Sequence, residues 1–197
     1  MIGYKTKEMS LLEQRIKALL KESQTILGIA YVVAVAIGML FTYQKYSKFG
    51  INIFDYAGVF DFLIAPFSDF RILFFIIISL LGTYSLFVFD SFYQNRFPKS
   101  YSRANFGLDK KRWYRSVRYF STAILFFLYL FISASSYGNI SKKRILNQTT
   151  IQITFADNQT KTGKMIGKTK EVLFLANENS VDVIPITALV KEIRVKE

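Results

Sequence analysis

Three long stretches of this chain contain no charged residue, and they constrain the fold more than any other feature. Residues 23–44, 72–89 and 119–141 are 22, 18 and 23 residues long, and charged side chains bound each of them. At about 1.5 Å of rise per residue, even the shortest would form a helix of about 27 Å, close to the ~30 Å hydrocarbon core of a membrane. With 51% apolar residues, the chain has little polar surface to cover three such helices in water. We therefore predict a transmembrane domain over 25–140, with spans at about 25–44, 72–89 and 119–138.

The segment before the first span is predicted to be an amphipathic helix over residues 1–24. Leu12, Ile16 and Leu19 share one stripe, and charged residues occupy the rest. Three Glu in this segment, followed by a long apolar run, exclude a cleaved signal peptide. The stripe fits either the cytoplasmic leaflet or a neighbouring subunit.

Residues 50–69 are apolar but carry Asp55 and Asp61. On one helix, Ile53, Tyr56 and Phe60 would share a face that excludes both carboxylates. We expect an amphipathic helix in the membrane interface, or a re-entrant segment; a fourth span would move the C-terminus to the other side. The two Asp either face lipid headgroups or, in an oligomer, form a carboxylate ring at the mouth of an ion path.

The net charge of +12 is concentrated beside the spans. Residues 90–118 hold eight basic residues against two acidic ones, and 142–144 add three more. We expect the basic loop 91–118 to bind anionic lipid headgroups, or a soluble protein partner, through Lys110, Lys111, Arg112 and Arg115. Nucleic acid is the less favoured partner, because these residues adjoin a span. The positive-inside tendency places the N-terminus and this loop in the cytoplasm.

Small residues recur every four positions in the first span, at Ala30, Ala34 and Gly38. Such spacing lets two helices approach closely, so we expect this stripe to pack against another span or against the same helix of a second copy.

From residue 149 the pattern changes to the alternation that is typical of strands. Five short strands are predicted, at 150–155, 163–169, 171–176, 180–184 and 192–195, with a helical turn at 187–189. Closure of these strands would protect their edges, so we predict a small five-stranded β-barrel domain over 145–197.

Three resemblances follow from these segments. The stretches TGKMIGKTKEVLFL and VDVIPITALVKEIRV resemble SH3-like and Sm-like small barrels. Three membrane helices before such a barrel are broadly similar to small-conductance mechanosensitive channels, whose last span is richer in Gly and Ala than residues 119–138. YSKFGINIFDY resembles a segment of the small membrane accessory proteins of type VI-B CRISPR and other phage-defence loci. That likeness implies a bacterial inner-membrane protein that permeabilises the membrane or regulates a nuclease.

Catalytic and metal chemistry is poorly represented. The chain has no Cys and no His, and it lacks a phosphate-binding Gly-rich loop and a serine elbow. We therefore expect a non-enzymatic membrane protein without a cofactor: a homo-oligomeric pore or membrane-perturbing effector, with antiphage defence as its setting. The alternative is a membrane-anchored adaptor that recruits a soluble partner through the basic loop or the barrel.

Overall fold

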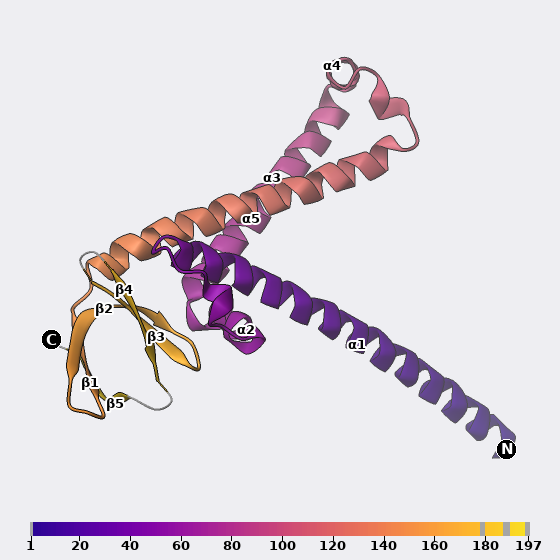
Figure 1. The fold of residues 1–197 in the computed structure, drawn as a ribbon. Coiled ribbons are helices and arrows are strands. Elements are labelled where there is room, and N and C mark those ends of the chain that lie inside the picture. Colours follow the sequence, from indigo (N-terminus) through magenta and orange to yellow (C-terminus); the bar gives the residue numbers. More distant parts are fainter. Residues whose placement is uncertain (1, 178–179, 187–189, 196–197) are drawn as a thin grey trace.

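The computed structural model describes residues 2–177, 180–186 and 190–195. Over these residues the chain forms five α-helices, two short 3-10 helices and five strands (Figure 1). In chain order these are α1 (Ile2–Ser47), η1 (Ile53–Asp55), α2 (Val59–Ser68), α3 (Phe70–Arg96), α4 (Pro98–Ala104), η2 (Leu108–Lys110), α5 (Tyr114–Leu146), β1 (Ile151–Phe155), β2 (Thr160–Lys168), β3 (Val172–Ala176), β4 (Val181–Pro185) and β5 (Val190–Val195).

Three helices of the described chain are long and apolar enough to cross a membrane: Ser23–Ser47 of α1, Phe70–Arg96 and Tyr114–Leu146. At most 17% of the most apolar window of each helix is buried inside the protein. So much exposed apolar surface requires a hydrocarbon surrounding, and the chain is therefore a membrane protein. Each helix extends beyond its predicted ends, since the flanking charged residues continue it.

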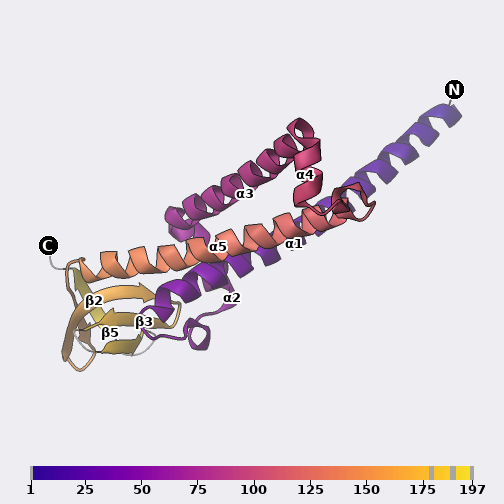
Figure 2. The same ribbon diagram turned by 90° about the horizontal axis from the view of Figure 1, so that it is seen from above.

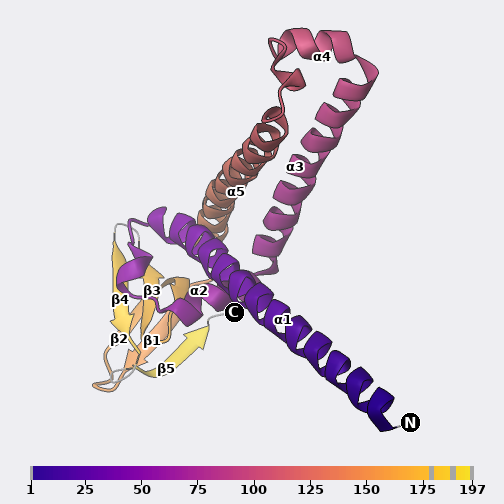
Figure 3. The same ribbon diagram turned by 90° about the vertical axis from the view of Figure 1, so that its right-hand side faces the viewer.

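Helices α3 and α5 form a hairpin that α4 closes (Figures 1 and 3). The C-terminal part of α1 crosses this hairpin near the sheet, whereas its N-terminal part lies away from the hairpin. The sheet lies at the end where α1 and α5 finish and α3 begins. The N-terminus and α4 lie far from the sheet in all three views (Figure 2). Residues 2–24 of the predicted amphipathic segment are part of the continuous helix α1, whereas the predicted basic loop is largely helical, with α4 and η2 inside it.

Two glycines allow other helices to approach α1 closely: Gly38 on α1 itself and Gly138 on α5. A Cβ on Gly38 would lie 1.8 Å from the backbone oxygen of Phe62 in α2, and a Cβ on Gly138 would lie 2.5 Å from the oxygen of Gln44. The expected stripe is thus used only in part, because Ala30 is exposed and Ala34 half-buried. Within this chain the partner of Gly38 is the short helix α2 and not one of the other two spans.

The segment between the first two spans does not form the single helix that would place Ile53 and Phe60 on one face. Gly50, with φ +75°, turns the chain after α1, and η1 and α2 are separate helices. Ile53 is fully buried, whereas Phe60 is 73% exposed. With ten residues, α2 is too short to span a bilayer.

The C-terminal segment contains the five predicted strands in one antiparallel sheet of order β4-β3-β2-β1-β5. The expected hydrogen-bonded closure is not found, because no pairing joins β4 to β5 among the described residues. The sheet is therefore open between these two edges. The predicted helical turn at 187–189 lies outside the described residues.

The sheet and the helices each have an apolar core of their own, and a third core is shared between them. The ring of Phe174 in β3 lies 5.1 Å from that of Tyr46 at the end of α1, and 5.4 Å from that of Tyr56. The buried residues of this core include Tyr46, Ile53, Phe62, Ile145, Ile166 and Phe174. The β domain is thus held against the ends of the spans by packing, and not only by its linker to α5.

Replacement of Gly38 by Ala is expected to destabilise the protein by about 1–3 kcal/mol, because a new methyl group would collide with the backbone of α2. The measurement is the thermal unfolding of the detergent-solubilised chain. Gly28→Ala in the same helix is the matched control, since no atom lies within 4 Å of a Cβ at that position. Equal stability of the two variants would contradict the close approach of α1 and α2.

Candidate functional site

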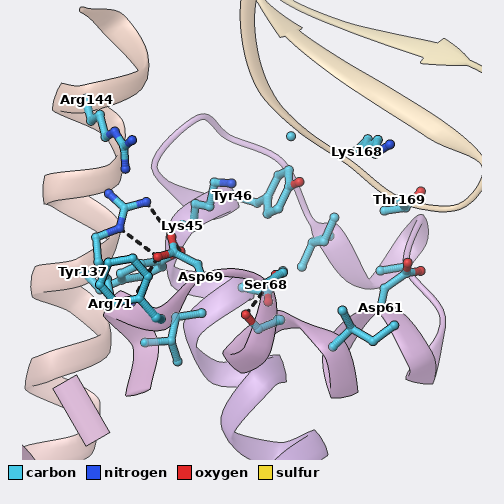
Figure 4. Close-up of a pocket in the computed structure, with 18 residues that line it drawn as sticks. Lys45, Tyr46, Asp61, Ser68, Asp69, Arg71, Tyr137, Arg144, Lys168 and Thr169 are labelled. Atoms are coloured by element: carbon cyan, nitrogen blue, oxygen red, sulfur yellow. Dashed lines mark hydrogen bonds and ion pairs between the residues drawn. The ribbon is translucent and has the colours of Figure 1, made fainter. Parts of the chain in front are cut away.

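A pocket lies where the ends of the spans meet the sheet, and we call it the junction pocket. Its volume is about 730 Å³, and α1, α2, α3, α5 and β2 all contribute to its wall (Figure 4). A neighbouring hollow of about 260 Å³ shares Lys45, Asp69, Arg71 and Arg144 with it and adds Ser141. The chain contributes polar groups from positions as distant as 45 and 168 to this one place.

Polar side chains gather at this pocket because several apolar elements have their polar ends here. Lys45 is in the last turn of α1, Asp69 is the N-cap of α3, and Arg144 is in the last turn of α5. Lys168 ends β2. Since all four ends meet on one side of the spans, the charges that flank separate segments of the sequence gather at one level.

Asp69 is the most highly connected residue of the pocket. Its two carboxylate oxygens accept hydrogen bonds from Nε and Nη2 of Arg71, at 2.8 and 2.5 Å, and from the Tyr137 hydroxyl at 3.0 Å. The backbone N–H of Arg71 also donates to it, which caps α3. Burial raises the pKa of Asp69, but the hydrogen bonds from Arg71 and Tyr137 outweigh this effect and hold the pKa below its ordinary value.

The remaining charges of the pocket are mainly positive. Asp61 uses one carboxylate oxygen to accept the Gly58 N–H at 2.9 Å, as the N-terminal cap of α2. Among the described residues, Lys45, Arg144 and Lys168 have no acidic group within 4 Å. The Lys45 ammonium lies instead 5.1 Å from the ring centre of Tyr46.

This arrangement is suited to holding an anion. It offers cationic and hydroxyl donors in a partly enclosed hollow, with its main carboxylate already neutralised by an arginine. No group of three metal-ligating His, Cys, Asp or Glu residues occurs in the part of the chain that the structure describes.

A second polar cluster closes the opposite end of the hairpin. Arg118 on α5 forms an ion pair with Asp90 on α3, at 2.6 Å, and Tyr101 of α4 donates to the same carboxylate at 3.3 Å. The hydroxyls of Tyr101 and Tyr114 lie 2.8 Å apart. Burial, the Tyr114 contact and the nearby Asp90 charge all raise the pKa of Tyr101, so this hydroxyl stays protonated and holds α4 in place.

The structure separates the predicted site residues. Asp61 reaches the junction pocket, while Asp55 is exposed and accepts a hydrogen bond from the Asn52 side chain at 2.9 Å. In this single chain the two carboxylates do not form a shared site. The predicted basic residues are exposed at the other end of the spans from the pocket: Lys110, Lys111 and Arg112 lie between α4 and α5, and Arg115 lies in the first turn of α5.

Sequence reasoning did not find the junction pocket. In the sequence, Lys45, Arg71 and Arg144 lie close to the ends of the three uncharged runs, and Asp69 lies at the end of the apolar segment 50–69, so nothing distinguishes them from other flanking charges. The one available signal was the Asp-x-Arg spacing at residues 69–71 directly before an apolar run, which favours a capped and charged helix start. That signal does not reveal which other helix ends lie nearby.

Comparisons with known proteins inform only the β domain. No protein-family model matches the chain, and no curated protein matches it. The C-terminal part is similar to a 1.55 Å crystal structure of the pleiotropic translational regulator Hfq, with 19% sequence identity and a TM-score of 0.24, over 29% of this chain and 86% of that chain. The likeness concerns fold and carries no information about a ligand. The resemblances to mechanosensitive channels and to phage-defence proteins stay predictions.

The connections of Asp69 predict an acid-dependent loss of stability. Because the pKa of Asp69 is below its ordinary value of 3.8 in the folded protein, its stabilising effect is fully present above that value and is lost as the pH falls through the lowered pKa. Asp69→Asn should therefore be less stable at neutral pH, by about 1 kcal/mol, and should lose less stability than the wild type on acidification.

Thermal unfolding between pH 7 and pH 2 measures this dependence. Tyr137→Phe should shift the acid loss to higher pH, because one hydrogen bond to the Asp69 carboxylate disappears. Tyr129→Phe, on the same helix, is the control. An acid profile of Asp69→Asn that matches the wild type would contradict this role of Asp69.

Proposed function

We propose that this chain is a non-enzymatic subunit of a homo-oligomeric membrane assembly that forms a pathway across the bilayer. The observation that carries the proposal is the open sheet: β4 pairs only with β3 and β5 only with β1, so the outer edge of each strand has no pairing among the described residues. An open edge is a template for pairing with another chain. Since the β domain is packed on the spans, edge pairing would also fix the position of the spans of successive copies.

The hydrogen-bond pattern of β4 favours such pairing. Ile186 donates its N–H to the oxygen of Glu171, so alternate residues of β4 face β3 with their backbone groups. Val183, which lies opposite Phe174, is therefore at a position where N–H and C=O point away from β3. The edge thus presents backbone donors and acceptors to a second chain.

The spans support the same proposal. Beyond its crossing with the hairpin, α1 diverges from α3 and α5 (Figures 1 and 3), and Ile26, Leu27 and Ile29 are 60–68% exposed. Ala30 lies on this unpartnered part of the helix. A small residue there allows a helix of another copy to approach closely.

A pathway would have to form between copies rather than inside one hairpin. The polar groups within the hairpin are already used, since Ser79 and Ser133 hydrogen-bond at 2.9 Å and Thr83 donates to the Ser79 carbonyl at 2.9 Å. In an assembly, Asp55 and Asp61 of several copies remain candidates for a carboxylate ring at its mouth.

In the proposed topology, the N-terminus and the loop 91–118 are cytoplasmic, and the sheet lies on the other side of a bacterial inner membrane. Support comes from the positive charge of the loop and from the three helices that alternate in direction. Helix α2 would lie in the interface, with Phe60, Ile64 and Phe67, which are 56–73% exposed, in contact with lipid. Antiphage defence as the setting rests on the resemblance of residues 46–56 alone.

Val183→Pro tests edge pairing, because it removes an N–H that faces the open edge and no bond between β3 and β4. We expect the variant to lose oligomers, measured by chemical cross-linking and by mass in detergent, together with ion flux into liposomes. Val183→Thr keeps the N–H and the branched shape, and it is the matched control. A monomeric wild type, or a Pro variant with unchanged oligomers, would contradict the proposal.

The adaptor remains the second candidate, because Lys110, Lys111, Arg112 and Arg115 are all exposed and Trp113 beside them is 50% exposed. None of these four cations forms an ion pair in the described part of the chain. Such a basic and aromatic surface suits an acidic partner or a lipid headgroup.

Charge reversal of Lys110, Lys111 and Arg112 distinguishes the two candidates when the topology is verified in parallel. For an adaptor, recruitment of soluble protein to the membrane is lost while liposomes of wild-type protein stay ion-tight. For a pore, the wild-type protein conducts, and charge reversal leaves the oligomer intact.

A further inference from the structure

We propose that the junction pocket binds the phosphate group of an anionic lipid, which thereby becomes part of the contact between the helices and the sheet. This inference goes beyond the proposed assembly and does not depend on it, because every group that carries it belongs to one chain.

The first argument is the charge of the pocket. The pocket is lined by four cations and two carboxylates; the cations are Lys45, Arg71, Arg144 and Lys168. Of the carboxylates, Asp69 accepts hydrogen bonds from Arg71, and Asp61 accepts the Gly58 N–H as the cap of α2. Figure 4 shows the side chain of Arg144 directed towards Arg71, although both are cations. Lys45 and Arg71 are half-buried, whereas Arg144 and Lys168 are exposed. Like charges gathered at one place repel each other, and an anion bound among them would relieve this repulsion. A phosphate oxygen is the acceptor that arginine and lysine bind best.

The second argument is an unused hydroxyl. Ser141 is only 3% exposed, and its Oγ makes no hydrogen bond of good geometry in the described part of the protein, although it lies near the Tyr137 side chain. It lines the hollow that also contains Lys45, Arg71 and Arg144. A buried polar group without a partner is costly, and a bound phosphate would supply the missing acceptor.

The third argument is the apolar side of the junction pocket. Its wall includes Ile64 and Phe70, which are 56% and 77% exposed on the outer surface of the helices. The pocket is therefore open to the surface that hydrocarbon covers, as well as lined by cations. This combination suits a molecule with an anionic head and acyl chains better than it suits a free phosphate ion.

The depth of the pocket agrees with the position of a headgroup. It lies where the first span ends at Ser47 and the second begins at Phe70, and Arg144 is two residues from the end of α5. Cations at the ends of spans lie at the level of lipid phosphates. A lipid phosphate would therefore reach the pocket without leaving its own leaflet.

Native mass spectrometry of the full chain in non-ionic detergent tests the inference, with phosphatidylglycerol and phosphatidylcholine as probes. We expect the wild type to retain phosphatidylglycerol in preference to phosphatidylcholine. Arg144→Gln should bind phosphatidylglycerol about tenfold more weakly, the factor that corresponds to one charge-assisted contact. The neighbouring Lys143→Gln is the matched control, because Lys143 is exposed and lines neither hollow.

Ser141→Ala supplies a variant with little risk to the fold, since it removes a buried hydroxyl that makes no hydrogen bond of good geometry in the described part of the protein. We expect weaker binding of phosphatidylglycerol with equal or higher thermal stability. Unchanged lipid binding in this variant would overturn the assignment of Ser141 as a ligand.

Inorganic phosphate, added to the lipid-loaded chain, distinguishes the two sources of the anion. Retention of the lipid supports a lipid site, and displacement by phosphate at comparable concentration overturns it in favour of a soluble phosphate site. Equal retention of the two lipids, or an equal loss of binding in Arg144→Gln and Lys143→Gln, would overturn the inference altogether. Binding by monomeric chains would leave it intact even where the proposed assembly fails.

Discussion

The contact between the end of α1 and the β sheet is the interaction on which the rest of the structure depends. Tyr46 and Tyr56 pack their rings against Phe174, and Ile53, Ile145 and Ile166 fill the space around them. This core explains why YSKFGINIFDY, which begins at the end of the first span and continues beyond it, is so apolar: the segment is the part of the helical domain that packs against the sheet. Without this core, the sheet would be tethered only through the end of α5, and no pocket would exist between sheet and helices.

The same contact gathers the charges of the molecule at one level. Hydrocarbon excludes charged side chains from the spans, so they collect at the helix ends. When four such ends meet beneath a sheet, cations from distant parts of the chain become neighbours. Asp69 neutralises only Arg71, which leaves the junction pocket positive. The anion-binding character of the pocket is therefore a consequence of how the membrane domain ends and where the sheet is held.

The residues that pack within one copy are different from those that form its exposed surfaces. Gly38 and Gly138 are used inside the chain, against α2 and α1, and Ser79 and Ser133 join α3 to α5. The diverging part of α1 and the edge strands β4 and β5 remain on the outside. This division favours assembly over a simple anchor.

The sequence alone determined the elements, and the tertiary structure decided their relations. Uncharged runs of 18 to 23 residues are set by the thickness of hydrocarbon, and alternating apolar residues by the pleat of a strand, so three spans and five strands could be predicted. The break between η1 and α2 was missed, because burial of Ile53 beneath the sheet outweighed the helical period of residues 53–64. The partner of Gly38, the open edges and the junction pocket depend on which helix ends meet in space. That information lies in long-range packing, which local periodicity and charge counts do not contain.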